Sequence, residues 1–279
     1  MLKRKTGAAA VLSAMIFLLM PLSVFAKTDK ASDLRELAKV VSEHGVKREA
    51  SFDVKYKGDM ADIETIINDG DFIFFESTLA MVDDPGTHED ADYLAATLNL
   101  SSDAYSVEAD GDVVTFKLPY FETLEQANYV KQKVPGILSE LGVSSMGNYE
   151  KVKAIHDYVC NLITYTGEPP EANSSMYNAL SKGEGLCNAY ALCMYRLCVE
   201  AGVPCKFVGG KAGTGRDADA HAWNIVALGD KWYYVDATWD DSTEGISYDY
   251  FLKGSSDFDA ADKTQPHTLE KAYGTGEFA

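Results

Sequence analysis

One segment of the sequence, GEGLCNAYALCMYRLCVEAG, constrains the fold more than any other. A tight turn containing two glycines opens a long apolar helix, and Cys187 lies at the start of that helix. Gly202-Val203-Pro204 ends the helix, because proline cannot continue it. Segments typical of strands follow, at residues 205–209, 221–228 and 231–239. The sequence therefore predicts a long helix followed by three strands.

Cys187 occupies the position where a helix most favours a nucleophile. The unpaired N–H groups and the dipole at a helix N-terminus stabilise a thiolate, and the same N–H groups can stabilise an oxyanion. Gly185, two residues earlier, would let a substrate approach closely. The remaining cysteines are expected in the middle of helices or at a strand start and lack this setting; they are Cys160, Cys193, Cys198 and Cys205.

The last two strands are predicted to form a hairpin that brings together a histidine and an aspartate. Gly229-Asp230 is typical of a two-residue turn, which fixes the register of the two strands. In that register Trp223 opposes Asp236, and His221 is a diagonal neighbour of Asp236, about 7–8 Å away at the backbone. A three-residue loop would instead turn Asp236 to the opposite face of the sheet.

Cys187, His221 and Asp236 follow one another in the order of a nucleophile, its base and the group that orients the base. A thiol needs a base to accept its proton, and the base needs a partner that holds its tautomer. Each residue alone has a structural interpretation: a small buried thiol, a strand histidine, and a turn or cap carboxylate. Together they predict a catalytic triad.

Four motifs carry a family resemblance: KVKAIHDYV, YNALSKGEGLCNAYALCMYRLC, HAWN and WYYVDATWDD. On these motifs the stretch from about Tyr149 to Asp241 resembles the transglutaminase-like superfamily, in its bacterial secreted branch. The resemblance implies an α+β fold with a papain-like core, in which the helix bearing the nucleophile packs on an antiparallel sheet. It also implies a thioester at Cys187, formed with loss of an amine and then attacked by water or by a lysine amine. Asn188 stands where eukaryotic transglutaminases carry tryptophan, and their calcium-binding β-domains are missing, which weighs against protein cross-linking.

The first 26 residues have the pattern of a signal peptide. Three basic residues precede an apolar run, and Val24-Phe25-Ala26 provides the small residues of a cleavage site. An uncleaved anchor is the alternative, although the run is only about 20 residues long and contains Pro21. We expect a signal peptide at 1–26, an N-terminal α/β module at 27–145 and a transglutaminase-like catalytic domain at 146–279. The mature chain is expected to be secreted or on the exterior of the cell envelope, without membrane insertion.

The N-terminal module is expected to alternate short helices and strands. Its predicted helices are 27–47 with Ser32 as N-cap, 60–67, 88–98 and 123–141, and its predicted strands are 50–56, 71–76, 105–108 and 113–119. Asp110-Gly111 is predicted as the turn between the last two strands.

The charge of the chain limits its partners. The formal net charge is −18, and it becomes −21 without residues 1–26, because these carry three basic and no acidic residues. So acidic a chain repels nucleic-acid phosphates and anionic lipids, so nucleic-acid binding is not expected. The resemblance implies chemistry on amides, and with it a protein or cell-wall peptide is the expected substrate. The sequence gives no cue to the oligomeric state.

No metal and no cofactor is expected. The cysteine spacing fits no zinc site, and the carboxylates around Asp236 lack the alternation of a calcium loop. Export would permit disulfides, but reduced and buried thiols are favoured because the chain is large enough to bury a core without them.

Three further roles in substrate binding have candidate residues. Trp223 is expected to line an acyl pocket beside the base, Gly185 to give access to the thiol, and Tyr177 or Tyr165 to offer a phenol to the oxyanion. Core packing is the alternative for each aromatic residue. The alternative function is a catalytically silent binding or scaffold module at the cell surface on the same fold.

Overall fold

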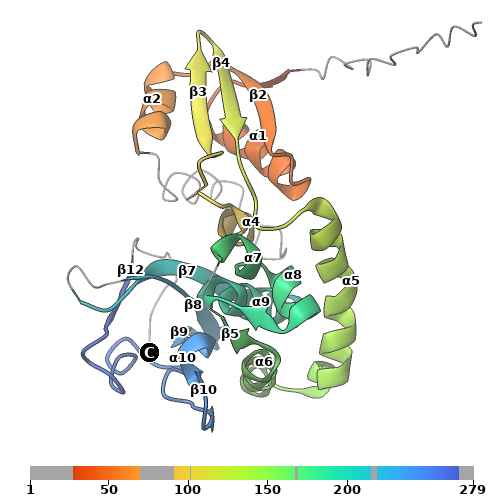
Figure 1. Ribbon diagram of the computed structural model, residues 1–279, viewed down its shortest axis with the longest axis vertical. Helices are drawn as coiled ribbons and strands as arrows, with labels where there is room; N and C mark the ends of the chain where they lie inside the picture. The colour runs from red at the N-terminus through yellow and green to blue at the C-terminus, as the bar shows by residue number, and fades with distance from the viewer. Residues whose placement is uncertain (1–27, 70–90, 101, 167–168, 215–218, 270–279) are drawn as a thin grey trace, which may run out of the picture.

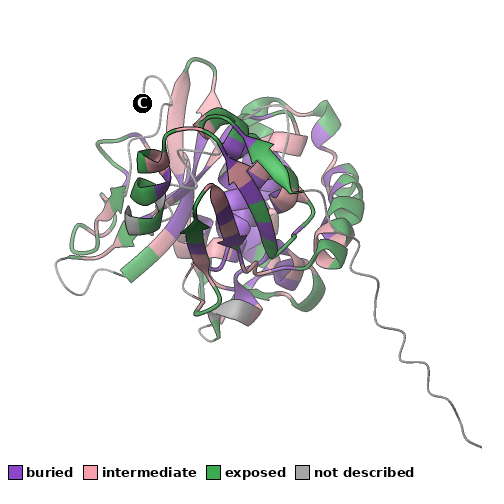
Figure 2. Cartoon of the chain, turned by 90° about the horizontal axis from the view of Figure 1, so that it is seen from above, coloured by how far each residue is buried: buried purple, intermediate pink, exposed green. Residues whose placement is uncertain are grey.

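The computed structural model describes residues 28–69, 91–100, 102–166, 169–214 and 219–269. Two units lie one above the other, each built on its own four-stranded sheet (Figure 1). Buried residues gather in the middle of the molecule, and many exposed residues lie on the outer helices (Figure 2). This mixed arrangement confirms the predicted α+β class.

The smaller unit contains a sheet in the order β1-β2-β4-β3. Its elements are β1 (Asp29–Ala31), α1 (Leu34–Val46), β2 (Ser51–Tyr56), α2 (Met60–Asp69), β3 (Ser106–Asp110) and β4 (Val113–Lys117). Phe52, Val54 and Tyr56 alternate with more exposed residues along β2, so one face of the sheet is buried. That face packs with α1 and α2 in a separate hydrophobic core.

The larger unit contains a sheet in the order β12-β7-β8-β9, packed against helices. Its helices are α5 (Leu124–Leu141), α6 (Asn148–Leu162), α7 (Pro170–Asn173), α8 (Met176–Lys182), α9 (Cys187–Glu200) and α10 (Ala237–Asp240), with a 3-10 turn η2 (Val143–Ser145). Its strands are β5 (Thr164–Tyr165), β6 (Glu184–Gly185), β7 (Cys205–Ala212), β8 (Asp219–Leu228), β9 (Lys231–Val235), β10 (Asp241–Ser242), β11 (Gly245–Ile246) and β12 (His267–Leu269). Helix α9 is buried along most of its length, as its apolar sequence predicts.

The two units share helix α4 (Ala91–Thr97), which lies between them (Figure 1). Tyr93 and Ala96 pack in the larger core, whereas Leu94 and Ala95 pack in the smaller one. Helix α5 also packs in the larger core, although it precedes the predicted boundary at residue 145. The N-terminal segment therefore contributes directly to the core that carries the nucleophile.

The predicted hairpin register is confirmed, because Leu228 pairs with Lys231 across the Gly229-Asp230 turn. The pairing stops at Asn224 and Val235, however, so the expected strand over 231–239 is four residues too long. Asp236 caps α10 instead of facing Trp223 across the ladder. Aspartate is a preferred N-cap residue, and this local preference for a helix start at Asp236 ends the strand.

Other boundaries differ in detail. Asp33, not Ser32, caps α1, and strand β1 was not predicted. The β3–β4 turn is Gly111-Asp112. The segment after Tyr250 forms an isolated bridge between Lys253 and Tyr234, and the last strand in the described part of the chain is β12. The predicted strand at 71–76 lies outside the described residues.

Within the described part of the chain, none of the helices is both long and apolar enough to cross a membrane.

Candidate functional site

Cys187 is the first residue of α9, and it is partly exposed. The start of this helix has no side-chain cap, and the N–H groups of Ala189 and Tyr190 donate to the carbonyl of Leu186, which leaves those of Cys187 and Asn188 for a bound oxygen. The thiol and His221 line the same cavity of about 270 Å³. The structure thus brings the predicted nucleophile and the predicted base together.

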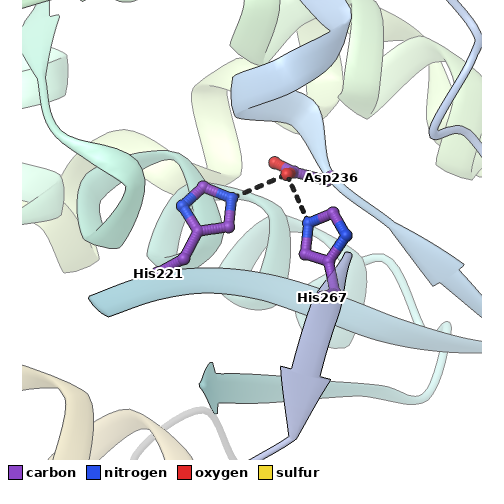
Figure 3. Close-up of side chains that lie close together, drawn as sticks. All are labelled: His221, Asp236 and His267. Carbon is purple, nitrogen blue, oxygen red and sulfur yellow. Dashed lines mark hydrogen bonds and ion pairs between the residues drawn. The ribbon is translucent and has the colours of Figure 1, made fainter. Parts of the chain in front are cut away.

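His221 and Asp236 form the predicted imidazole–carboxylate contact (Figure 3). Nε2 of His221 lies 2.7 Å from Oδ2 of Asp236. The other carboxylate oxygen, Oδ1, accepts the backbone N–H groups of Thr238 at 2.9 Å and Trp239 at 3.3 Å. Asp236 is fully buried, so these bonds fix its orientation between the start of α10 and the base.

The site perturbs the pKa values of both groups. Burial alone would lower the pKa of His221, but the charge and hydrogen bond of Asp236, followed by those of Cys187, raise it to about 10. Burial alone would raise the pKa of Asp236, but the charge and hydrogen bond of His221, followed by those of His267, hold it well below its usual range. This arrangement favours an imidazolium beside an ionised carboxylate, with Cys187 as the third partner.

A second histidine, His267 on β12, contacts the same carboxylate (Figure 3). Its Nε2 lies 3.2 Å from Oδ2 of Asp236, and its Nδ1 lies 2.7 Å from Oδ1 of Asp259. His267 is not among the site residues predicted from the sequence. It lies 31 residues after Asp236, beyond a connection without regular periodicity, so no pattern could have signalled its position.

His221, Asp236 and His267 are also the described residues that could hold a metal ion, since one ligand atom from each lies within 4.8 Å of the others. The carboxylate oxygen already accepts from both rings, at 2.7 and 3.2 Å. An ion would have to replace both of these hydrogen bonds. The hydrogen-bonded arrangement is therefore the one that the geometry favours.

The cavity beside Cys187 is mainly apolar, and part of its wall comes from the smaller unit. Its lining residues include Ala95, Leu98, Leu100 and Phe121 from the N-terminal segment, and Phe207, Gly209, Ala220 and Ala222 from β7 and β8. None of the site residues predicted from the sequence lies in the N-terminal segment. A helix that lies between two cores cannot be recognised from its own seven residues.

Asn188, the residue after the nucleophile, joins the two parts of this cavity. Its Nδ2 donates to the backbone carbonyl of Ala96 at 3.0 Å and to that of Ser174 at 2.7 Å. The side chain thereby ties the start of α9 to α4. The sequence does not show what Asn188 binds.

The three substrate-binding candidates do not line this cavity. Trp223 is buried with Tyr250 and Phe258, on the face of the sheet opposite the cavity. Its ring centroid nevertheless lies 5.8 Å from that of His221. Tyr177 packs edge-on against Tyr129, 5.3 Å away. Both aromatic residues have the packing role that was their alternative.

Gly185 is required by packing against the protein itself. A Cβ at this position would lie 2.7 Å from Cβ of Ala189 and 3.2 Å from Cγ2 of Ile163. The glycine therefore allows α9 to begin close to α6. The side chain of Tyr165, the second phenol candidate, is exposed over about half of its surface. The burial of the other half, and then the nearby charge of Cys187, raise its pKa.

A buried cluster that includes the last residue of α10 supports the site. His156 on α6 lies 3.1 Å from Oδ2 of Asp240, whose Oδ1 accepts the backbone N–H of Tyr250 at 2.9 Å. Both ionisable side chains are fully buried. Because Asp236 and Asp240 are the two ends of one short helical turn, this cluster fixes the segment that carries Asp236.

The comparisons with known proteins point to the same region of the chain. Residues 138–237 match the model of the transglutaminase-like superfamily. These residues form a transglutaminase-like domain. The match covers Cys187, His221 and Asp236, and with it the predicted α+β fold with a transglutaminase-like core is confirmed.

The similar curated proteins are animal peptidases that are much longer than this chain. Kyphoscoliosis peptidase from Mus musculus is 30% identical over 122 residues, which are 39% of this chain and 18% of that protein. Kyphoscoliosis peptidase from Homo sapiens is 30% identical over 141 residues, which are 45% of this chain and 21% of that protein. The chain thus spans about a fifth of the length of these relatives. Bacterial origin and export remain predictions from the sequence.

Among solved structures, the periplasmic domain of TgpA from Pseudomonas aeruginosa is similar at 18% identity, with a TM-score of 0.34. The similarity covers 47% of this chain and 57% of that one.

Proposed function

We propose that this chain is a cysteine-dependent amide hydrolase or acyltransferase that acts through a thioester on Cys187. The observation that carries the proposal is the 2.7 Å contact between His221 and Asp236, beside a cavity that His221 and Cys187 both line. A nucleophile, a base and an orienting carboxylate are the groups that acyl transfer by a thiol requires.

The reaction would proceed in two halves. The Cys187 thiolate attacks the carbonyl carbon of an amide, and N–H groups in the first turn of α9 donate hydrogen bonds to the resulting oxyanion. Because Nε2 of His221 is bound to Asp236, its Nδ1 is the nitrogen left to protonate the departing amine, so that the C–N bond breaks and a thioester remains. Nδ1 then takes a proton from water or from an acceptor amine, which attacks the thioester and releases Cys187.

The apolar cavity supports a peptide substrate with an apolar group near the reacting amide. With the leader-like residues 1–26, we propose that the mature protein acts outside the cell on a protein or cell-wall peptide. No cofactor takes part in this scheme.

The test uses casein and a fluorescent amine, with the mature protein and its Cys187→Ala variant. We expect the wild type to cleave casein or to attach the amine, and the variant to do neither while it unfolds at the same temperature. Equal activity of the two proteins would end the proposal.

Alkylation by iodoacetamide separates an enzyme from a silent scaffold without a known substrate. Burial raises the pKa of Cys160, Cys193 and Cys205, and Cys198 is fully buried, so these four thiols should react slowly. Cys187 should be alkylated at least tenfold faster. Equal labelling of all five thiols would favour the scaffold.

A further inference from the structure

We propose that His267 and Asp259 form a second histidine–carboxylate pair that positions Asp236, and through it the base His221. His267 would then be a positioning residue for the reaction, because it contacts neither the thiol's cavity nor the reacting atoms. This inference rests on the proposed function of Cys187, His221 and Asp236.

The carboxylate of Asp236 is saturated with hydrogen bonds. Oδ1 accepts two backbone N–H groups in α10, and Oδ2 lies between His221 and His267, at 2.7 and 3.2 Å (Figure 3). A carboxylate offers about four acceptor positions, and all four are used. Without His267, Oδ2 would be held from one side only, and the carboxylate could turn away from the base.

Asp259 fixes the position and orientation of the His267 ring. Its Oδ1 contacts Nδ1 of His267 at 2.7 Å, and its Oδ2 accepts the backbone N–H of His267 at 3.2 Å. Both ring nitrogens of His267 thus lie within hydrogen-bond distance of a carboxylate oxygen, one on Asp236 and one on Asp259.

The contact between His267 and Asp236 persists through the catalytic cycle. Four side chains follow one another in contact, from Asp259 through His267 and Asp236 to His221. When His221 gives its proton to the leaving amine, Asp236 loses one cationic partner. The hydrogen bond between His267 and Asp236 remains, so the carboxylate keeps its position and holds the His221 ring oriented for the second half of the reaction.

The surrounding packing is built to place His267 here. Its ring centroid lies 4.3 Å from those of Phe258 and Trp239 and 4.8 Å from that of Trp223. Its side chain is only 2% exposed. Gly210 on β7 makes room for β12, because a Cβ there would lie 2.4 Å from the carbonyl oxygen of Thr268.

The experiment compares substitutions that separate packing from hydrogen bonding. His267→Phe keeps an aromatic ring in the aromatic cluster but removes both ring nitrogens, whereas His267→Gln keeps an N–H donor at about the place of Nε2. Asp259→Asn weakens the support of the ring, and Asp262→Asn, on an exposed carboxylate bonded only within its own turn, is the matched control.

With casein and the fluorescent amine as probes, we expect His267→Phe to lower kcat about 10- to 100-fold, since a hydrogen bond to a charged group is lost. KM should change less than twofold, because the cavity is untouched. His267→Gln should recover at least fivefold over His267→Phe, Asp259→Asn should lower kcat about threefold, and Asp262→Asn should match the wild type.

Two results would overturn the inference. In the first, kcat of a folded His267→Phe protein equals that of the wild type while Cys187→Ala is inactive; the proposed function then stands and the positioning role fails. If His267→Phe does not fold, Asp259→Asn and His267→Gln decide, and unchanged kcat in both overturns the role. Absence of turnover in the wild type, with no selective alkylation of Cys187, defeats the proposed function itself.

Discussion

At the scale of single residues, the site depends on how one buried carboxylate distributes its hydrogen bonds. Oδ1 of Asp236 caps the N-terminus of α10, whereas its Oδ2 contacts the base His221. The structural and the chemical roles therefore use different oxygens of the same side chain. A substitution that keeps one oxygen can separate the two roles.

Asp236→Asn should keep the helix cap but lose the anion. We expect kcat/KM to fall by about 10³- to 10⁴-fold, because the uncharged amide no longer stabilises the imidazolium and can impose the wrong tautomer. Thermal unfolding, followed by circular dichroism, should show that the protein still folds. A variant that retains a tenth or more of the wild-type activity would contradict this role.

The raised pKa of His221 also predicts how stability depends on pH. The pKa is about 10 in the folded protein against an ordinary value of 6.5, so the folded state holds this proton more tightly between those values. The contribution is complete below about pH 6.5 and is lost as the pH rises towards 10, by up to about 1.4 kcal/mol per pH unit in the middle of the window.

Urea unfolding at several pH values from 6 to 10 measures this dependence. Asp236→Asn removes the main cause of the shift, so its free energy of unfolding should fall less steeply with pH than that of the wild type. Parallel curves for the two proteins would show that the pair contributes no such linkage.

At the scale of the elements, the start of α9 is where several constraints meet. The helix presents Cys187 at its N-terminal end. It lies close to Ile163, at the end of α6, because Gly185 has no side chain in the space between them. A hydrogen bond from Asn188 connects it to α4. The nucleophile is therefore positioned by its neighbours in the fold as much as by its own helix.

Asn188→Ala should test this attachment. Two backbone carbonyls, those of Ala96 and Ser174, would lose their donor, which should cost about 1–3 kcal/mol of unfolding free energy. Asn161→Ala is a suitable control, because its amide donates at 2.6 Å within its own helix and is exposed, so the change should stay within about 0.5 kcal/mol. Equal effects of both substitutions in urea unfolding would argue against the attachment.

Particular residues show which parts of these elements could be predicted from the sequence. The turn Gly229-Asp230 fixed the register and so brought His221 near Asp236, because turn geometry is a local property. The end of β9 was misplaced because cap and strand preferences compete at Asp236. His267 could not be found, since nothing local determines how the chain returns from Lys253 to the edge of β7.

At the scale of the whole molecule, the smaller unit completes the cavity of the larger one. Leu98, Leu100 and Phe121 line the cavity beside Cys187, although all three precede the matched domain at residues 138–237. The Cζ atoms of Arg48 and Arg196 lie 6.0 and 5.3 Å from the ring centroid of Tyr93. These contacts connect the two units further. The units are therefore expected to act as one body.

Phe121→Ala should change substrate binding more than chemistry. The loss of its apolar surface should raise KM for peptides with an apolar residue at the reacting amide by about tenfold, since a buried aromatic contributes about 1.5–3 kcal/mol, while kcat should stay within twofold. Leu124→Ala, at an exposed position outside the cavity, should leave both constants unchanged. Steady-state kinetics on a peptide series would show the difference, and a fall in kcat alone would contradict it.

The shared cavity wall has a consequence for how proteins of this kind could diverge. Bond making would depend on Cys187, His221 and Asp236, but the shape offered to the acyl group depends in part on residues 95–121, at least 66 positions upstream of the nucleophile. Two chains with the same three reacting residues could therefore accept different amides. Substitutions confined to the upstream segment would retune selectivity and leave the reaction itself unaltered.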